Sequence, residues 1–280
     1  MKIIPLEIFD PSIQPITVEE MYGDWPISEA EVYALVNRSL HPRDSSMLYE
    51  KMAALGVQPD HTVLDIGCRD AAHTCRLAER LGCNMVGVEP VDRHMREAIA
   101  LVQEKGLTNR VAIHQGAIEA IPLEAASVDH IWCRDMLNHL PDLRRGLAEC
   151  RRVLRAGGQM LIYQTFATPM IEAREAAWLY AALAVVPANM DPVYFEKQAQ
   201  AVGFQIIERD PVDSEWRESW EEEGVRTTSK QLLQIARMRR DRERLLGEMG
   251  RVAYTVELAN SVWGVFQMLG KLCPTVYMLQ

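Results

Sequence analysis

The sequence predicts an α/β fold, in which a mostly parallel sheet of seven strands has helices on both faces and carries an added helical cap. Two observations predict it. Between about residues 62 and 163, short runs rich in β-branched residues alternate with longer patterns of helical periodicity. A long helical section, Glu215 to Leu269, then separates two further strand-like runs. The 280 residues suffice for one large domain, or for a core domain with a cap.

The predicted strands are short apolar runs separated by helical patterns at Ala71–Leu81, Asp92–Lys105 and Leu143–Leu154. Right-handed crossovers would place these helices on both faces of a parallel sheet. Ligands of such sheets bind beyond the carboxyl ends of the strands, so the residues that follow each strand are candidates for a site. The predicted strands are Thr62–Ile66, Met85–Val88, Val111–His114, Val128–Cys133, Gln159–Tyr163, Gly203–Asp210 and Pro274–Leu279.

Composition divides the chain into four parts. Residues 1–55 hold several prolines between short helical patterns, and we expect an N-terminal helical lid there. Residues 56–212 form the predicted core, residues 213–270 a helical cap inserted before the last strand, and residues 271–280 that strand. Aromatic side chains of the cap either cover a substrate or pack the helices on the sheet, and we expect packing for most of them. They are Trp216, Trp220, Tyr254, Trp263 and Phe266.

Charge and composition exclude several classes of protein. The formal net charge of −9 argues against a general affinity for nucleic-acid backbones, so we expect no nucleic-acid partner. The longest apolar stretch, Ala176 to Ala188, is shorter than the roughly 18 residues of a membrane span. The opening MKIIPLEIFD is not a signal peptide, because Pro5, Glu7 and Asp10 interrupt it. The six cysteines form no CxxC pair, and no metal-ligand spacing occurs. We therefore expect a reduced, cytoplasmic protein without a metal site; a homodimer stays open.

The segment VLDIGC, Val63 to Cys68, closes the first predicted strand and leads into a helix. Asp65 lies at the end of that strand, and Gly67 allows a close approach of the backbone to a ligand because it has no Cβ. The helix that follows offers free N–H groups and the positive end of its dipole. This arrangement suits a nucleoside cofactor that carries a carboxylate and hydroxyls, although Gly67 alone could belong to an ordinary turn.

The second predicted strand ends in VGVEP, about twenty residues after the first. Glu89 at its end can accept hydrogen bonds from both hydroxyls of a ribose, as acidic residues do in dinucleotide folds. Alone, Glu89 could be a solvated loop acid. On adjacent predicted strands, Gly67 and Glu89 together favour nucleoside binding.

Five blocks carry a resemblance to a known family: VLDIGC, VGVEP, GAIEAIPL, VDHIWCRDMLNHLPD and VLRAGGQMLIY. In order and spacing they resemble the class I methyltransferases, over roughly Thr62 to Gln164. The resemblance implies a Rossmann-like sheet and methyl transfer from S-adenosylmethionine to a small-molecule acceptor, with S-adenosylhomocysteine as product.

The resemblance also implies which residues surround this cofactor, from its methionine end to its adenine. Two departures from the family pattern concern them. Arg69 and Ala71 stand where the family's GCGxG loop has glycine. Either their side chains narrow the approach of the backbone to the cofactor, or Arg69 forms a local pair with Asp70. Ala117 stands where the family often has an acid that binds the adenine amino group. The implied residues are Cys133 and Arg134 near the methyl group, Asp65, Gly67 and Cys68 along the methionine and ribose, Glu89 at the ribose hydroxyls, Pro90 and Val91 near the adenine, and Ala117 and Ile118 bordering the adenine ring.

Methyl transfer from a sulfonium is an in-line displacement that needs alignment, with a base if the nucleophile carries a proton. His139, about one turn beyond the fourth predicted strand, is the leading base candidate; the alternative is that HLPD caps the next helix, with Asp142 as N-cap. Asp135 is the second candidate, as a base or as the partner of a cationic group, against a loop hydrogen-bonding role.

A third candidate lies in MYGDW, which faintly resembles the phosphobase methyltransferases. In those enzymes an N-terminal tyrosine closes over the site and pairs with a histidine after the fourth strand. The resemblance implies a dyad of Tyr22 and His139, and the alternative is a surface or packing aromatic.

Two functions follow from these patterns. The first is methyl transfer to a small molecule, with no motif that reveals an oxygen, nitrogen, sulfur or carbon acceptor. The second is a methyltransferase-like protein that binds S-adenosylmethionine without methylating, as a cyclase, an isomerase or a binding module, which the altered loop at Arg69 and Ala71 suggests.

Overall fold

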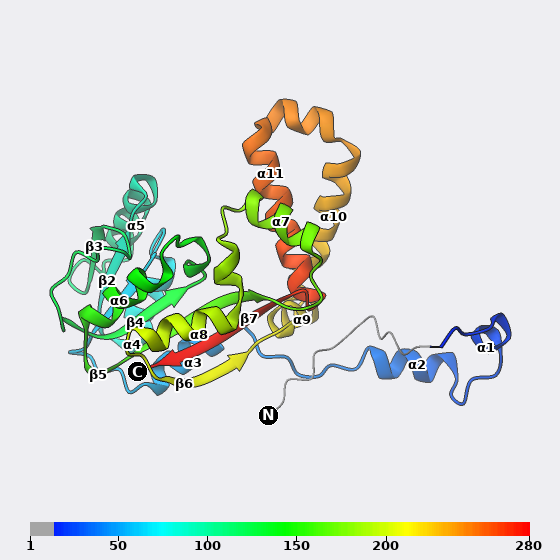
Figure 1. The fold of residues 1–280 in the computed structure, drawn as a ribbon, viewed down its shortest axis with the longest axis horizontal. Helices are drawn as coiled ribbons and strands as arrows, with labels where there is room; N and C mark the ends of the chain where they lie inside the picture. The colour runs from blue at the N-terminus through cyan, green and yellow to red at the C-terminus, as the bar shows by residue number, and fades with distance from the viewer. Residues whose placement is uncertain (1–13) are drawn as a thin grey trace.

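The computed structural model describes residues 14–280, so the opening segment MKIIPLEIFD lies outside the described residues. One sheet of seven strands, in the order β3-β2-β1-β4-β5-β7-β6, forms the core of the molecule (Figure 1). Strands β1 to β5 pair in parallel, and β7 runs antiparallel to both of its neighbours. The predicted α/β fold with a mostly parallel, Rossmann-like sheet is therefore confirmed. The strands are β1 (Thr62–Ile66), β2 (Asn84–Glu89), β3 (Val111–Gln115), β4 (Val128–Arg134), β5 (Leu154–Ala167), β6 (Ile206–Pro211) and β7 (Leu272–Leu279).

Alternating side chains of the central strands enter two separate hydrophobic cores. In β4, Ile131 and Cys133 join one core, whereas Trp132 between them joins the other. Because successive side chains of a strand point to opposite faces, a buried parallel strand needs an apolar layer on each side. Helices α6 (Leu143–Val153) and α8 (Pro192–Ala201) supply one layer, and the other comes from α3 (Met47–Ala54), α4 (Ala72–Leu81) and α5 (Asp92–Glu104).

A helical hairpin projects from the sheet between β6 and β7 (Figure 1). The predicted helical section consists of three helices, α9 (Glu215–Glu222), α10 (Thr227–Arg240) and α11 (Arg242–Met268). In α11, Gly250 has a φ of +76° and interrupts the helical backbone. Helix α7 (Ala173–Ala182) packs on α11, where a third core forms around Leu179, Ala259 and Leu272.

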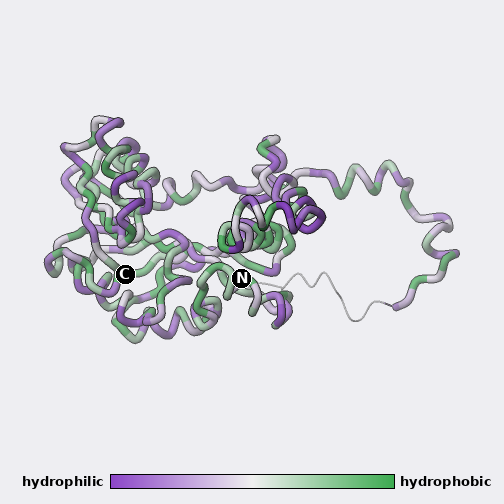
Figure 2. The backbone as a smooth tube through the Cα atoms, turned by 90° about the horizontal axis from the view of Figure 1, so that it is seen from above, coloured by the Kyte–Doolittle hydropathy of each residue, from purple (hydrophilic) through white to green (hydrophobic). Residues whose placement is uncertain are grey.

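The described N-terminal residues form an arm that leaves the sheet domain (Figure 1). It contains α1 (Val18–Tyr22) and α2 (Glu29–Val36), each begun by a capping box, from Thr17 and Ser28 respectively. Neither helix has a buried residue, and hydrophobic and hydrophilic stretches alternate along the arm (Figure 2). The root of the arm is attached to the core by Arg43, whose guanidinium pairs with Asp210 at 2.7 Å and Glu215 at 2.6 Å.

Two regions differ from the prediction. Strand β5 continues to Ala167, beyond the predicted end at Tyr163, because β7 pairs with it antiparallel as far as Leu272. The periodicity of the sequence also predicts no helix at α8, although Asp191 caps it and Pro192 occupies its first position. Short 3₁₀ turns, η1 (Leu137–His139) and η2 (Pro187–Met190), complete the described elements.

Candidate active site

The loop after β1 is held against β2 by its own backbone. The amides of Gly67 and Cys68 both donate to the carbonyl of Val88, at 2.9 and 3.2 Å. Gly67 has a φ of +76°, and Arg69 and Ala71 have φ values of +52° and +60°. The two residues that replace glycine thus retain the left-handed backbone that glycine favours. No ion pair joins Arg69 to Asp70 among the described residues; Asp70 instead accepts a hydrogen bond from the amide of Ala72 at 3.3 Å.

Glu89 fixes this loop to the end of β2. Its carboxylate is 5% exposed and accepts hydrogen bonds from the amides of Arg69 (3.0 Å) and Val91 (2.9 Å), one at each oxygen. The Nδ1 atom of His94 lies 3.4 Å from Oε1. Each carboxylate oxygen has two lone pairs, so Glu89 keeps acceptor capacity for two hydroxyl groups. Pro90 and Val91 lie exposed beside it.

Asp65 is buried at the end of β1. Thr74 of α4 donates a hydrogen bond to its Oδ2 at 2.5 Å. Burial raises the pKa of Asp65 to about 7, against the lowering effect of the Thr74 hydroxyl. This carboxyl therefore titrates near neutral pH.

Three of the residues implied for the cofactor have side chains in the protein core. Cys68 packs against Gly87, where an added Cβ would lie 2.7 Å from the Cys68 sulfur. Cys133 and Ile118 belong to the core on the α6 face. Burial raises the pKa of both thiols, which are thereby kept protonated. Such residues can meet a ligand through their backbone, as can Ala117, which is half-buried.

At the end of β4, Arg134 contacts the Nε2 atom of His73, and its guanidinium lies 5.6 Å from the centre of the Tyr163 ring. The Nδ1 atom of His73 contacts the hydroxyl of Tyr49. Burial and then the charge of Arg134 lower the pKa of His73 to about 4, so its imidazole is neutral. No sequence motif marks Tyr49 or His73 as site residues, because only the packing of α3 on α4 brings them together with Arg134.

Asp135 follows β4 with a φ of +51°. Its amide donates to the carbonyl of Tyr163 at 2.7 Å, and its Oδ1 accepts from the hydroxyl of Thr165 at 3.3 Å. Burial raises the pKa of Asp135, against the opposing charge of Arg134. A carboxylate of raised pKa that faces a cavity can take a proton from an acceptor.

The structure separates the other two catalytic candidates. His139 is exposed at the end of η1, with Nδ1 3.1 Å from the carbonyl of Ala184. Asp142 does cap α6, as it accepts from the amide of Arg145 at 3.0 Å. Tyr22, the last residue of α1 on the arm, is 78% exposed, and no hydrogen bond joins it to His139 among the described residues. The predicted dyad is not assembled in this arrangement.

A cavity of about 120 Å³ opens beside Asp135, between the ends of β4 and β5 and the helices α9 and α11. Trp216 stacks on Tyr163 in its wall, with ring centres 4.6 Å apart and planes 8° from parallel. The cap thus contributes three of its five named aromatic residues, Trp216, Trp220 and Trp263, to the cavity, and only Tyr254 and Phe266 pack elsewhere, fewer than the majority expected. The lining residues are Arg134, Asp135, Tyr163, Asp213, Trp216, Arg217, Trp220, Trp263, Gln267 and Pro274.

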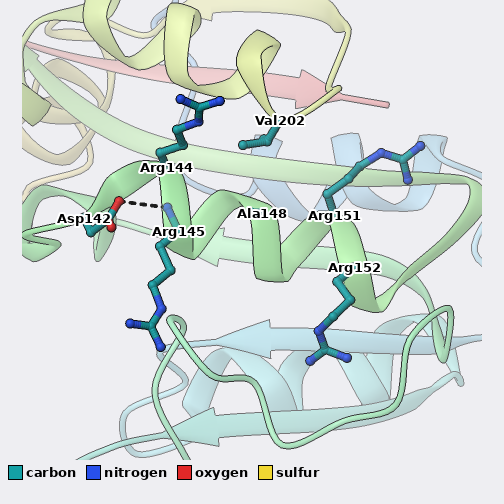
Figure 3. A pocket seen from close by; sticks show the side chains of 7 residues that line it. All are labelled: Asp142, Arg144, Arg145, Ala148, Arg151, Arg152 and Val202. Carbon is teal, nitrogen blue, oxygen red and sulfur yellow. Dashed lines mark hydrogen bonds between the residues drawn. The ribbon is translucent and has the colours of Figure 1, made fainter.

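A second, more open hollow lies over α6 (Figure 3). Arg144 and Arg151 point to one side of the helix, and Arg145 and Arg152 to the other (Figure 3). Arg145 and Arg152 donate to backbone carbonyls of residues 119–123 and hold that loop against α6. None of the predicted site residues lines this hollow.

A family model described as a methyltransferase domain matches residues 64–162. Sarcosine/dimethylglycine N-methyltransferase of Halorhodospira halochloris is 31% identical over 123 residues, 43% of each chain. Geranyl diphosphate 2-C-methyltransferase of Saccharopolyspora erythraea is 29% identical over 140 residues, 49% of each chain. The core of this chain belongs to the class I methyltransferases. The matches span less than half the length of each of these relatives.

The fold has solved counterparts. Geranyl diphosphate C-methyltransferase of Streptomyces coelicolor A3(2), in complex with Mg²⁺, geranyl diphosphate and S-adenosylhomocysteine, superposes with a TM-score of 0.64 at 14% identity, over 84% of this chain and 77% of that one. Among residues 14–280 no group of side chains could hold a metal ion. Within the same residues, no helix has the length and apolarity to cross a bilayer.

Proposed function

We propose that this methyltransferase-family chain transfers the methyl group of S-adenosylmethionine to a small-molecule acceptor. The observation that carries the proposal is the position of Glu89. Its buried carboxylate keeps free lone pairs directly beside a loop of left-handed residues, and two ribose hydroxyls fit this acceptor. The methyltransferase relatives and the S-adenosylhomocysteine in the Streptomyces enzyme support the choice of cofactor.

The residues present fit the proposed cofactor from ribose to methionine. Gly67 has no Cβ and a φ of +76°, so its backbone can approach a ligand closely. Asp65 and Arg134 supply a carboxyl and a guanidinium for the amino and carboxylate groups of the methionine part, and Ala117 and Ile118 border the adenine. When bound, the sulfonium supplies an electrophilic methyl group.

The cavity beside Asp135 is the proposed acceptor site. It adjoins Arg134, which we place at the methionine part, so an acceptor there would lie close to the methyl group. The stacked rings of Tyr163 and Trp216 would orient the acceptor and exclude water. Asp135 would take the proton from an acceptor that carries one.

We propose that the N-terminal arm acts as a lid over the acceptor cavity. Its root is attached through Arg43 to Glu215 of α9, and the next two residues of α9 line the acceptor cavity. Large apolar side chains of the arm, including Tyr22 and Trp25, are more than half exposed and gain by burial against another surface. Closure over the cavity is the movement that could bring Tyr22 toward His139.

We also propose that the protein is cytoplasmic, has no nucleic-acid substrate and forms a homodimer. The five buried cysteine thiols support a reducing, cytoplasmic compartment. The net charge of −9 argues against a nucleic-acid substrate. The exposed apolar arm offers one surface through which two copies could associate. No observation favours the non-methylating alternative.

Calorimetric titration with S-adenosylmethionine and S-adenosylhomocysteine tests the proposal. We expect micromolar affinity for both. The masses of products from a panel of small acceptors then separate the two functions, since a methyl group adds mass and an isomerisation or cyclisation does not. Failure of both cofactors to bind would contradict the proposal.

A further inference from the structure

Arg217 of α9 is a partly buried cation without a counter-charge. Its Nε and Nη2 atoms both donate to Oε1 of Gln267, at 2.9 and 2.7 Å, and its Nη1 donates to Oε1 of Gln231 at 2.9 Å. These partners are neutral amides, and no carboxylate lies within 4.0 Å of this guanidinium among residues 14–280. Burial lowers the pKa of Arg217, which reflects the free-energy cost of holding an unpaired charge there.

Arg134 repeats this situation on the opposite side of the same cavity. It contacts the neutral imidazole of His73 and the face of Tyr163, and in the described part of the chain it has no ion pair. Buried or half-buried cations in proteins are normally paired with an anion. Two unpaired guanidiniums at one cavity therefore indicate that the missing negative charge belongs to a ligand.

The unused hydrogen-bonding groups of the cavity are mainly donors. A guanidinium has five N–H groups, and three of those on Arg217 are engaged, which leaves two. The indole Nε1 of Trp216 is buried without a partner among the described residues. A ligand that satisfies such donors must present acceptor atoms, and a carboxylate presents the most in the least space.

The two acids of the cavity do not cancel this preference. Neither Asp135 nor Asp213 forms an ion pair with Arg134 or Arg217 among residues 14–280, and Oδ1 of Asp135 already accepts a hydrogen bond from Thr165. A cationic ligand would meet Arg134 and Arg217, which already lie over the rings of Tyr163 and Trp220 at 5.6 and 5.2 Å. Those aromatic faces are thus occupied by cations of the protein itself.

We propose that the methyl acceptor is a small carboxylate with a flat, unsaturated body, and that Arg217 of the cap binds its carboxylate. This inference rests on the proposed function, because it names the substrate class of the same site. The flat body would lie among Tyr163, Trp216 and Trp220, the rings that wall the cavity. Arg217 is then the group by which the cap selects an acceptor, and Arg134 remains with the methionine part of the cofactor.

The test compares three probes of one shape and different charge: benzoate, benzyl alcohol and benzylamine. Each is titrated into the full-length protein, with tryptophan fluorescence as the readout because three tryptophans line the cavity. We expect benzoate to bind most tightly, and its affinity to fall as salt rises, as befits an ionic contact. Equal or tighter binding of benzyl alcohol or benzylamine, or no binding of benzoate, would overturn the proposal.

Variants locate the contact. Arg217→Gln should weaken benzoate binding by about tenfold or more, and Arg217→Lys by less, because lysine keeps the charge but not the planar fork. Arg240→Gln, an exposed arginine outside the cavity, is the matched control and should bind benzoate as the wild type does. Unchanged affinity in Arg217→Gln overturns the assignment. Should Arg217→Gln fail to fold, the charge order of the probes and the salt dependence in the wild type still decide the proposal.

The same titrations distinguish this inference from the proposed function. Benzoate binding is measured without cofactor, and cofactor binding without benzoate. If the protein binds benzoate but not S-adenosylmethionine, the carboxylate site is supported and the proposed methyl transfer is contradicted. If the protein binds S-adenosylmethionine but binds the three probes equally, the proposed methyl transfer is supported and the carboxylate acceptor is contradicted.

Discussion

The hydroxyl of Thr165 donates a hydrogen bond to Oδ1 of Asp135 at 3.3 Å, and thereby joins β5 to the loop that follows β4. The same hydroxyl accepts from Nε2 of Gln267 at 3.2 Å, and Oε1 of Gln267 accepts from Arg217. Every donor in this series points toward Asp135. The cap helices α9 and α11 are thus connected through one buried threonine to the candidate base.

Thr165→Val should shift the pH dependence of methyl transfer. Loss of the donated hydrogen bond destabilises the ionised form of Asp135 and raises the pKa of this carboxyl further. If Asp135 must be ionised to take a proton, the acid limb of kcat/KM against pH moves to higher pH. Thr165→Ser keeps the hydroxyl and should restore the wild-type limb. An unmoved limb in a folded Thr165→Val enzyme would show that Asp135 is not the titrating base.

Glu89→Ala should weaken the binding of S-adenosylhomocysteine. The ribose hydroxyls would lose their acceptor, and the amides of Arg69 and Val91 would lose theirs. We expect a loss of about 1–3 kcal/mol in binding free energy, measured by calorimetry. Glu97→Ala, an exposed acid on α5, is the control for the removal of one negative charge. Wild-type affinity in Glu89→Ala would contradict the ribose assignment.

Asp65→Asn should flatten the pH dependence of the free energy of unfolding between about pH 4 and 7. The folded-state pKa of Asp65, about 7, lies above the ordinary value of 3.8 for an aspartate, so the folded protein holds this proton more tightly than the unfolded chain. Stability is then greatest at low pH and falls by up to about 1.4 kcal/mol per pH unit through this window, from Asp65 alone. Denaturant unfolding without cofactor, across the window, measures the slope. The exposed Asp60→Asn should keep the wild-type slope, and an unchanged slope in Asp65→Asn would refute the raised pKa.

His139→Ala and Tyr22→Phe test the lid and the dyad together. If the arm closes and His139 acts as a base, His139→Ala should slow methyl transfer by about 100-fold or more and leave cofactor affinity unchanged. Tyr22→Phe should slow the reaction by a related factor, and the double variant should be no slower than the worse single one, because the two residues would act as a unit. Full activity of His139→Ala would leave His139 with only its contact to Ala184.

The strands and their order along the chain could be predicted because each strand carries a local signal. Val63 to Ile66 and Met85 to Val88 are buried apolar runs, and VLDIGC and VGVEP follow a family pattern. The end of β5 could not be predicted from local sequence. Its partner β7 lies over 100 residues further along the chain, and no local pattern indicates that the two strands pair. Helix α8 does have a local signal, the cap Asp191 followed by Pro192, but its apolar residues lack a clear helical periodicity.

The candidate site was predictable only where one residue at the end of a strand suffices. Asp65, Gly67, Glu89 and Asp135 all lie at the expected edge of the sheet. Arg217 could not be selected, because its importance arises from packing of α9 and α11 and from the absence of a counter-charge. The conformation of Arg69 was likewise hidden, since sequence propensity assigns positive φ to glycine rather than to arginine.

That conformation leads to a prediction about stability. Arg69 has a φ of +52° and an exposed side chain, so its backbone is strained without a compensating contact of the side chain among the described residues. Arg69→Gly removes the strain and keeps the amide that donates to Glu89. The free energy gained by removing the strain exceeds the cost of the extra conformational entropy of a glycine in the unfolded chain, and we expect a net stabilisation of about 0.5–1 kcal/mol.

Arg96→Gly, at an exposed position inside α5, is the matched control and should destabilise by about 1 kcal/mol. Urea unfolding of both variants without cofactor gives the comparison. Equal destabilisation by the two substitutions would mean that the loop holds Arg69 without strain, and that its departure from glycine carries no cost to the fold.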